Sequence, residues 1–156
     1  VVVSTGKLEE QKEVLLNLGV KDVIHRSEVD DNSGRPLLRP RWAGVIDTVG
    51  GNTLATAIKT TNYCGAVTTC GNAGGVDFTS SVYPFILKGI TLYGIDSVDC
   101  PMNLRLKIWD LLSNEWKLDD LDDMVNVVSL EELNDSIDSI MAGKHVGRTV
   151  VDLEKI

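Results

Sequence analysis

Four consecutive residues, Ser4, Thr5, Gly6 and Lys7, are the best placed to do chemistry, because they directly follow the short apolar run 1–3. In an open parallel sheet, ligands bind just beyond the carboxyl ends of the strands. Two hydroxyl groups, a glycine that lets a ligand approach the backbone, and a lysine ammonium group suit a dianionic phosphate. No acid stands among these four residues to bind the ribose hydroxyls of NAD. The segment therefore predicts a site for the 2′-phosphate of NADP.

A second cation, Arg26, stands at the end of the next predicted strand and could reach the same phosphate. The residue types alone leave an alternative open. Thr5 and Lys7 would then be no more than a hydroxyl-capped helix start followed by a solvated lysine.

Two glycine-rich segments follow later apolar runs. Asp47 precedes Gly50 and Gly51, and an aspartate after a strand can be a phosphatase nucleophile of the haloacid dehalogenase type. That chemistry uses a second aspartate two residues later, where Val49 stands, so the glycine pair is better explained by close approach to a ligand or a neighbouring helix. The segment 71–75 is not the dinucleotide motif G-x-G-x-x-G, because alanine stands where the second glycine would be.

The histidines and cysteines form no catalytic or metal-binding pattern. His25 and His145 are far apart in the sequence, which favours surface or structural roles. Cys64, Cys70 and Cys100 are odd in number and lack C-x-x-C spacing, so buried free thiols in a reducing compartment are expected. We predict no metal site, and no residue is identified as a catalytic acid or nucleophile.

A parallel sheet is predicted to position these groups. Apolar runs alternate with helical patterns, and strands that are apolar throughout are typical of a doubly wound α/β sheet covered on both faces. Gly19 is expected to end the first helix, and Asn52 to cap the second at its N-terminus. Strands are expected at 1–3, 20–24, 42–47, 66–69 and 91–95, helices at 8–18, 52–61 and 102–109, and a short turn or helix at 82–87.

The C-terminal part of the chain continues the alternation after an acidic stretch at 115–123. A strand at 125–128, a helix at 131–142 and a strand at 148–153 are predicted. Ser129 and Glu132 have the spacing of a capping box, and Gly143 is expected to end the helix. Its buried face is expected to consist of Leu133, Ile137, Ile140 and Met141.

Composition limits the possible partners. The chain has 156 residues, 43% of them hydrophobic, and a net charge of −8 that would repel a nucleic-acid backbone. No apolar run approaches the roughly 20 residues that cross a bilayer. A globular cytoplasmic protein that binds neither nucleic acid nor membrane is expected.

Four segments stand in an order and at distances that resemble a known family. Residues 3–7, 41–51, 83–89 and 94–98 together resemble the zinc-independent, quinone oxidoreductase-like branch of the medium-chain dehydrogenases/reductases, of the acryloyl-CoA reductase type. The resemblance implies an NADPH-dependent oxidoreductase that transfers hydride to an activated C=C bond, as in an acryloyl-CoA-like enoyl thioester, or to a quinone.

The resemblance also implies further cofactor contacts. Carried over by position, Asn72 would contact the cofactor through its backbone, since the family usually has an apolar residue there. Ile86 and Ser97 would line the nicotinamide half of the site. A homodimer joined through the strand near 92–95 is implied as well.

The same resemblance implies an incomplete Rossmann-type sheet. Residues 1–124 would be part of the NADP-binding lobe, and residues 125–156 would return as a β-α-β segment towards a GroES-like substrate domain. The family's substrate domain, first Rossmann strand and pyrophosphate loop would lie upstream, so this chain alone is expected to be inactive. The alternative is a non-catalytic NADP-binding or interaction module.

Overall fold

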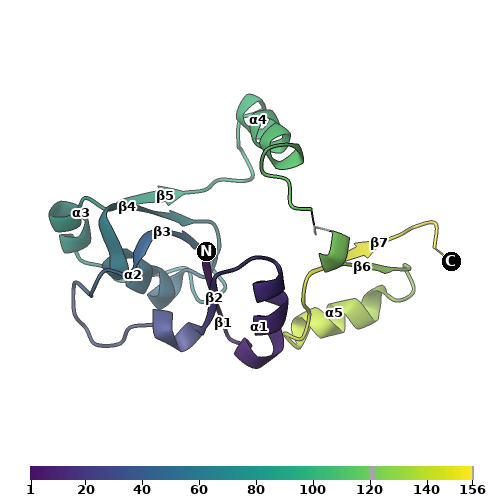
Figure 1. The fold of residues 1–156 in the computed structure, drawn as a ribbon, viewed down its shortest axis with the longest axis horizontal. Helices are drawn as coiled ribbons and strands as arrows, with labels where there is room; N and C mark the ends of the chain where they lie inside the picture. Colours follow the sequence, from purple (N-terminus) through teal and green to yellow (C-terminus); the bar gives the residue numbers. More distant parts are fainter. Residues whose placement is uncertain (120–121, 156) are drawn as a thin grey trace. The chain divides into compact units, whose positions relative to one another are not determined.

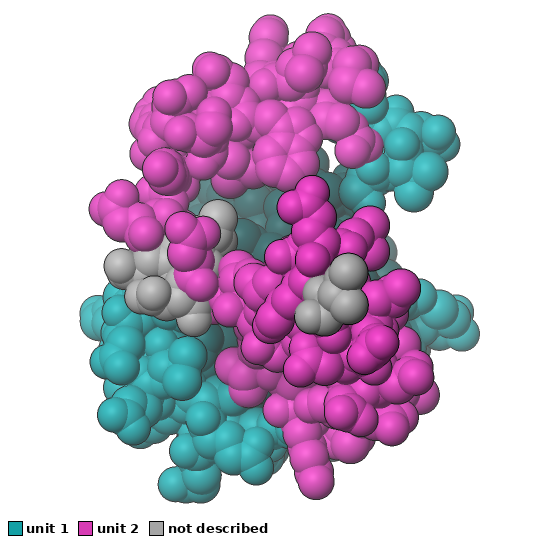
Figure 2. All heavy atoms as spheres, turned by 90° about the vertical axis from the view of Figure 1, so that its right-hand side faces the viewer, with its two compact units in different colours: residues 1–101 teal, residues 102–156 magenta. Residues whose placement is uncertain are grey.

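Parallel strands alternate with helices along the chain in the computed structural model, which describes residues 1–119 and 122–155 (Figure 1). The contacts divide the chain into two units, residues 1–101 and 102–156, which are coloured separately in Figure 2. The predicted acidic stretch falls partly outside the described residues. The boundary predicted after residue 124 concerns a path to a substrate domain and stays a prediction.

The first sheet of unit 1 pairs β1 (Val2–Thr5) with β2 (Asp22–His25) in parallel. Two parallel neighbours need a crossover, and α1 (Leu8–Asn17) supplies it. Gly19 follows the helix with a φ of 83°, as predicted for a residue that ends a helix in the left-handed region. The 3-10 helix η1 (Arg26–Val29), which the sequence did not predict, begins directly after β2.

The second sheet of unit 1 has the strand order β3-β4-β5, all parallel. Its core is formed where α2 and β4 meet, and Ile58 and Val67 are fully buried there. The elements are β3 (Trp42–Asp47), α2 (Gly51–Thr60), β4 (Thr61–Thr69), α3 (Tyr83–Lys88) and β5 (Thr91–Gly94).

The predicted parallel α/β architecture is confirmed, but the sheet is not continuous. In the described part of the chain, the only partner of β1 is β2. Likewise, the only partner of β3 among the described strands is β4. Ile46 in β3 is 80% exposed, although an all-apolar parallel strand is normally covered on both faces. Among the described residues, no strand adjoins the edge of β3 that faces away from β4, so part of the apolar surface of β3 stays open.

The prediction that Asn52 caps α2 is wrong. The helix is preceded by Gly50 at a φ of 71° and begins at Gly51, so Asn52 lies within the first turn. Its side-chain amide donates hydrogen bonds to the Asp30 carboxylate at 2.8 Å and the Asp31 carbonyl at 3.0 Å. The asparagine therefore fastens the preceding loop to the helix.

Unit 2 contains α4 (Met102–Ser113), η2 (Asp122–Met124), β6 (Val125–Val128), α5 (Leu133–Met141) and β7 (Arg148–Val151). The capping box is confirmed, because the Ser129 N–H donates to Glu132 and the Glu132 N–H donates to the Ser129 hydroxyl. The buried face predicted for α5 is wrong: Met141 is 82% exposed and Ile140 is 52% exposed. The two short strands β6 and β7 offer too little surface to cover it.

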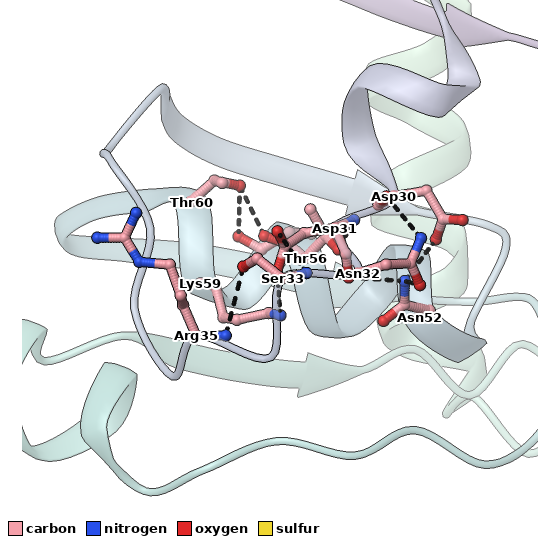
Figure 3. Close-up of polar contacts among 10 residues, drawn as sticks. Asp30, Asp31, Asn32, Ser33, Arg35, Asn52, Thr56, Lys59 and Thr60 are labelled. Carbon is pink, nitrogen blue, oxygen red and sulfur yellow. Dashed lines mark hydrogen bonds and ion pairs between the residues drawn. The ribbon is translucent and has the colours of Figure 1, made fainter.

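The loop between η1 and β3 is bound to α2 by the polar network of Figure 3. Lys59 Nζ lies 2.8 Å from Asp31 Oδ2, and both side chains are mostly buried. The Asp31 N–H donates to the Thr56 hydroxyl at 2.8 Å. Hydrogen bonds from Lys59 and then from Ser33 hold the pKa of Asp31 below its ordinary value of 3.8.

We expect unit 1 to lose stability as the pH falls through the lowered folded pKa of Asp31. A carboxyl group with a lower pKa in the folded state stabilises the fold above its unfolded pKa and loses that contribution on acidification. Asp31→Asn and Lys59→Met should each flatten this acid dependence, and the double variant should flatten it no further. Thermal unfolding followed by circular dichroism between about pH 3 and pH 7 measures it. An Asp31→Asn variant with the wild-type pH dependence would contradict this expectation.

Candidate functional site

A cavity of about 520 Å³ in unit 1 is lined by both β1 and β3. Consecutive residues of both strands line the cavity, whereas a cavity on one face of a strand would be lined by every second residue. The cavity therefore runs along strand edges, with the polar residues Ser4, Asp47 and Thr48 towards the carboxyl ends of the strands. Its lining is Val1–Ser4, Ile24, Val29, Trp42, Gly44–Val49, Thr53 and Ala57.

The turn between β1 and α1 brings four predicted phosphate ligands together. Thr5 is paired with His25 in the sheet, so Arg26 begins beside this turn. The Arg26 guanidinium carbon lies 3.0 Å from the position that a Cβ on Gly6 would occupy. Glycine at position 6 thus gives the arginine room to lie against the backbone of this turn.

The side chains of this turn contact one another and the start of α1. The Lys7 N–H donates to the Thr5 hydroxyl at 3.1 Å, and that hydroxyl contacts the side-chain oxygen of Gln11. Lys7 Nζ lies 3.8 Å from the Glu10 carboxylate. Such a solvent-accessible pair contributes little stability, so a phosphate can replace the carboxylate as the partner of the lysine. Ser4 is exposed and lines the cavity.

Asp47 is buried and fully engaged in hydrogen bonds at the carboxyl end of β3. Its carboxylate accepts from the Val49 N–H at 3.2 Å, from the Gly50 N–H at 3.1 Å, and from the Thr69 hydroxyl at 2.9 Å. These bonds make a nucleophilic role implausible, because the oxygens already hold the adjoining loop. The sequence reasoning missed this role, although a strand-ending aspartate before two glycines was its visible signal.

Gly50 and Gly51 allow a close approach, as predicted, but the neighbour is the loop after β4 and not the predicted ligand or helix. A Cβ on Gly50 would lie 2.5 Å from the Gly75 carbonyl oxygen, and one on Gly51 would lie 2.7 Å from that of Gly74. Gly74 N–H donates to the Val49 carbonyl at 2.7 Å. The two glycine-rich segments therefore pack against each other.

The remaining predicted cofactor residues belong to the second sheet. Asn72 is exposed in the loop after β4, and its backbone carbonyl accepts from Gly75 N–H at 3.0 Å. Ile86 is 69% exposed on α3, and Ser97 is exposed in the loop after β5. Thr5, Gly6, Lys7 and Arg26 adjoin the first sheet, so the predicted ligands form two groups.

The cysteines are free, as predicted, but the prediction that they are buried is wrong. Cys64 and Cys70 are exposed, since Cys64 lies at an irregular part of β4 with a φ of 56° and Cys70 leaves the sheet after Thr69. His25 is exposed and its Nδ1 lies 2.7 Å from the Ser27 hydroxyl. Within residues 1–119 and 122–155, no three His, Cys, Asp or Glu side chains gather as metal ligands.

Lys88 was also missed by the sequence reasoning. Its ammonium group donates to the carbonyls of Lys59 and Thr61, at 2.8 and 3.2 Å, where α2 ends and β4 begins. Burial lowers the pKa of Lys88. This lysine fastens α3 to the end of α2 and so has a structural role.

Comparison with known proteins gives close relatives, although no family model matches the chain. Over 98% of its length, the chain is 40% identical to YhfP of Bacillus subtilis. YhfP is named as a quinone oxidoreductase. It is 36% identical over 96% of its length to the acrylyl-CoA reductase AcuI of Ruegeria pomeroyi. The crystal structure of YhfP with NAD bound superposes with a TM-score of 0.91.

The chain is similar over nearly its whole length to medium-chain dehydrogenases/reductases. A second solved member, YhdH of Escherichia coli K-12 with NADPH bound, is 36% identical and superposes with a TM-score of 0.88. The chain spans 46% of the length of YhfP and 45% of that of AcuI, so it matches less than half of these medium-chain dehydrogenases/reductases. These relatives therefore confirm the resemblance that the four segments carried.

Proposed function

We propose that this chain is part of an NADPH-dependent reductase that acts on the activated C=C bond of an acryloyl-CoA-like enoyl thioester, or on a quinone. The observation that carries the proposal is the turn between β1 and α1, which holds Thr5, Gly6 and Lys7 and where the Arg26 guanidinium lies against Gly6. The names of the relatives YhfP and AcuI, and the NADPH bound to YhdH, support it.

The residues present fit the 2′-phosphate of NADPH. Lys7 and Arg26 supply two cations, and α1 begins without a side-chain cap on its first N–H groups, so these remain available to an anion. Ser4 and Thr5 add hydroxyl donors. In the adjoining sheet, Asn72 would contact the cofactor through its backbone, and Ile86 and Ser97 would line the nicotinamide half.

When bound, NADPH supplies the hydride. The residues of this chain hold and orient the dinucleotide, and an apolar side chain such as Ile86 keeps water from the nicotinamide. We assign no proton donor to this chain. Zinc independence rests on the resemblance and is part of the proposal.

The proposed longer protein would complete the sheet. The cavity along the open edges of β1 and β3 would take up one further strand, and residues 125–156 would lead towards the substrate domain. A homodimer joined through β5 and a cytoplasmic location complete the proposal. β5 ends the strand order of its sheet, and Tyr93 on it is 52% exposed. No helix among the described residues has the length and apolar character to cross a membrane.

Titration of the isotope-labelled chain with NADPH and NADH, followed by NMR, tests the proposal. We expect the amide signals of residues 4–7 and 26 to shift, and to saturate at roughly tenfold lower concentrations of NADPH than of NADH. Equal responses to both, or no response of these signals to millimolar NADPH, would contradict the proposal. Binding without NADPH oxidation by the longer protein, tested with acrylyl-CoA and quinones, would favour the non-catalytic module.

A further inference from the structure

Asp47 has a buried carboxyl group that the proposed function does not use. Asp47 is only 4% exposed. Burying a carboxylate costs folding free energy unless hydrogen-bond donors surround it. The donors near it include the N–H groups of Val49 and Gly50 and the hydroxyl of Thr69. The carboxylate thus joins the end of β3 to the end of β4 through neutral donors.

The backbone of the same residue makes a second connection. The Asp47 carbonyl accepts the Cys70 N–H at 2.9 Å, directly after β4. We call residues 48–51 the first glycine loop and residues 70–75 the second glycine loop. The Asp47 carboxylate therefore holds the first glycine loop, and the Asp47 carbonyl holds the start of the second glycine loop. Thr69, directly before the second glycine loop, also donates a hydrogen bond to the carboxylate.

The two glycine loops also contact each other directly, and at most of their glycines there is no space for a side chain. A bridge pairs Gly50 with Gly75, and a Cβ on Gly71 would lie 2.1 Å from the Thr48 carbonyl oxygen. Because these contacts are backbone to backbone, the loops have little freedom to shift separately. The exposed Asn72 projects from the second loop, next to Gly71.

We propose that Asp47 is a positioning residue, which fixes the two glycine loops against each other and so holds the backbone of residue 72 ready for the dinucleotide. The claim that residue 72 contacts the dinucleotide rests on the proposed function. The claim that Asp47 positions the two glycine loops rests on the contacts alone. A loop that is correctly arranged only part of the time lowers the apparent affinity of its ligand by that fraction.

The test compares NADPH affinity with stability in four variants of the chain. Asp47→Ala removes the carboxylate, Asp47→Asn keeps an acceptor oxygen, and Thr69→Val removes one donor. Ile58→Val is the matched control, because it weakens the core of α2 without touching either loop. Affinities are measured by NMR titration at a temperature well below the unfolding midpoint of every variant.

We expect Asp47→Ala to weaken NADPH binding about tenfold, and Asp47→Asn and Thr69→Val to weaken it about threefold, while Ile58→Val leaves it unchanged. A structural role alone would lower the unfolding midpoint of all four and leave the four affinities alike. If Asp47→Ala does not fold, the other variants decide. Wild-type affinity in both Asp47→Asn and Thr69→Val, or an equal loss in Ile58→Val, would overturn the proposal.

Hydrogen exchange without ligand separates this proposal from the proposed function. In Asp47→Asn, the amides of Gly74 and Gly75 should exchange several-fold faster than in the wild type, with Ile58→Val again as control. Faster exchange in a chain that does not bind NADPH would support the positioning of the loops and contradict the proposed function. Unchanged exchange of both amides would overturn the positioning role itself.

Discussion

Replacing Lys7 by alanine is expected to weaken NADPH binding by roughly 10- to 100-fold and to leave NADH binding nearly unchanged. A charge-assisted hydrogen bond to a phosphate contributes about 1.5–3 kcal/mol, which corresponds to that range of affinities. The effect is selective because NADH lacks the 2′-phosphate. Titration of the variant and the wild-type chain with both cofactors measures it.

Two further variants control for the charge and for the resting partner of Lys7. Lys12→Ala removes a cation from the exposed side of the same helix and should change the affinity for NADPH little. Glu10→Gln removes the carboxylate that lies 3.8 Å from Lys7 Nζ, and should strengthen NADPH binding by no more than about threefold. Equal losses of NADPH and NADH affinity in Lys7→Ala would make Lys7 a structural residue, and no loss would make it a solvated lysine.

Arg26 should behave like Lys7, but more weakly. Its guanidinium lies against Gly6 and reaches the turn from β2, so it would contact a phosphate from one side only. Adding a methyl group at position 6 would push this flexible side chain aside without changing any charge. A selective loss of NADPH affinity in both Arg26→Ala and Gly6→Ala would therefore trace the effect to the position of the guanidinium.

Local patterns predicted most of the helices and strands, and the position of Arg26 beside the turn between β1 and α1. The turn between β1 and α1 is contiguous in sequence, and Arg26 reaches it by a register that any parallel β-α-β unit provides. The end of α1 at Gly19 and the capping box at Ser129 depend on residues a few positions apart. Such features need no knowledge of the rest of the fold.

Features that depend on distant neighbours could not be predicted from the sequence. Asn52 has the residue type of a helix cap, but the positive φ of Gly50 starts α2 earlier and directs Asn52 to Asp30. The exposed Ile46 and Met141 follow from what surrounds β3 and α5, which residue patterns do not contain. Asp47 acquires its role only because Thr69 ends the strand beside it.

Gly71→Ala is expected to destabilise unit 1 at or above the upper end of the ~1–3 kcal/mol typical of overpacking. The new Cβ would lie 2.1 Å from the Thr48 carbonyl oxygen and 2.7 Å from the carbonyl carbon. A side chain can change rotamer to relieve such an overlap, but here the opposing atoms are backbone. Either the two glycine loops separate or β3 and β4 shift at their carboxyl ends.

Gly94→Ala is the matched control for this prediction. Gly94 ends the neighbouring strand β5, and a Cβ there would meet no atom within 4 Å. Neither Gly71 nor Gly94 has a positive φ, so both substitutions avoid the strain of left-handed backbone and differ mainly in the overlap. We expect Gly94→Ala to change the free energy of unfolding by no more than about 0.5 kcal/mol.

Urea unfolding of both variants and the wild-type chain measures the difference directly. Truncating the neighbouring side chain by Thr48→Ala should not rescue Gly71→Ala, because the obstructing atom is the carbonyl oxygen and remains in place. A Gly71→Ala chain as stable as Gly94→Ala would mean that the two glycine loops can separate at little cost. That result would also remove the rigid contact through which Asp47 is proposed to hold residue 72.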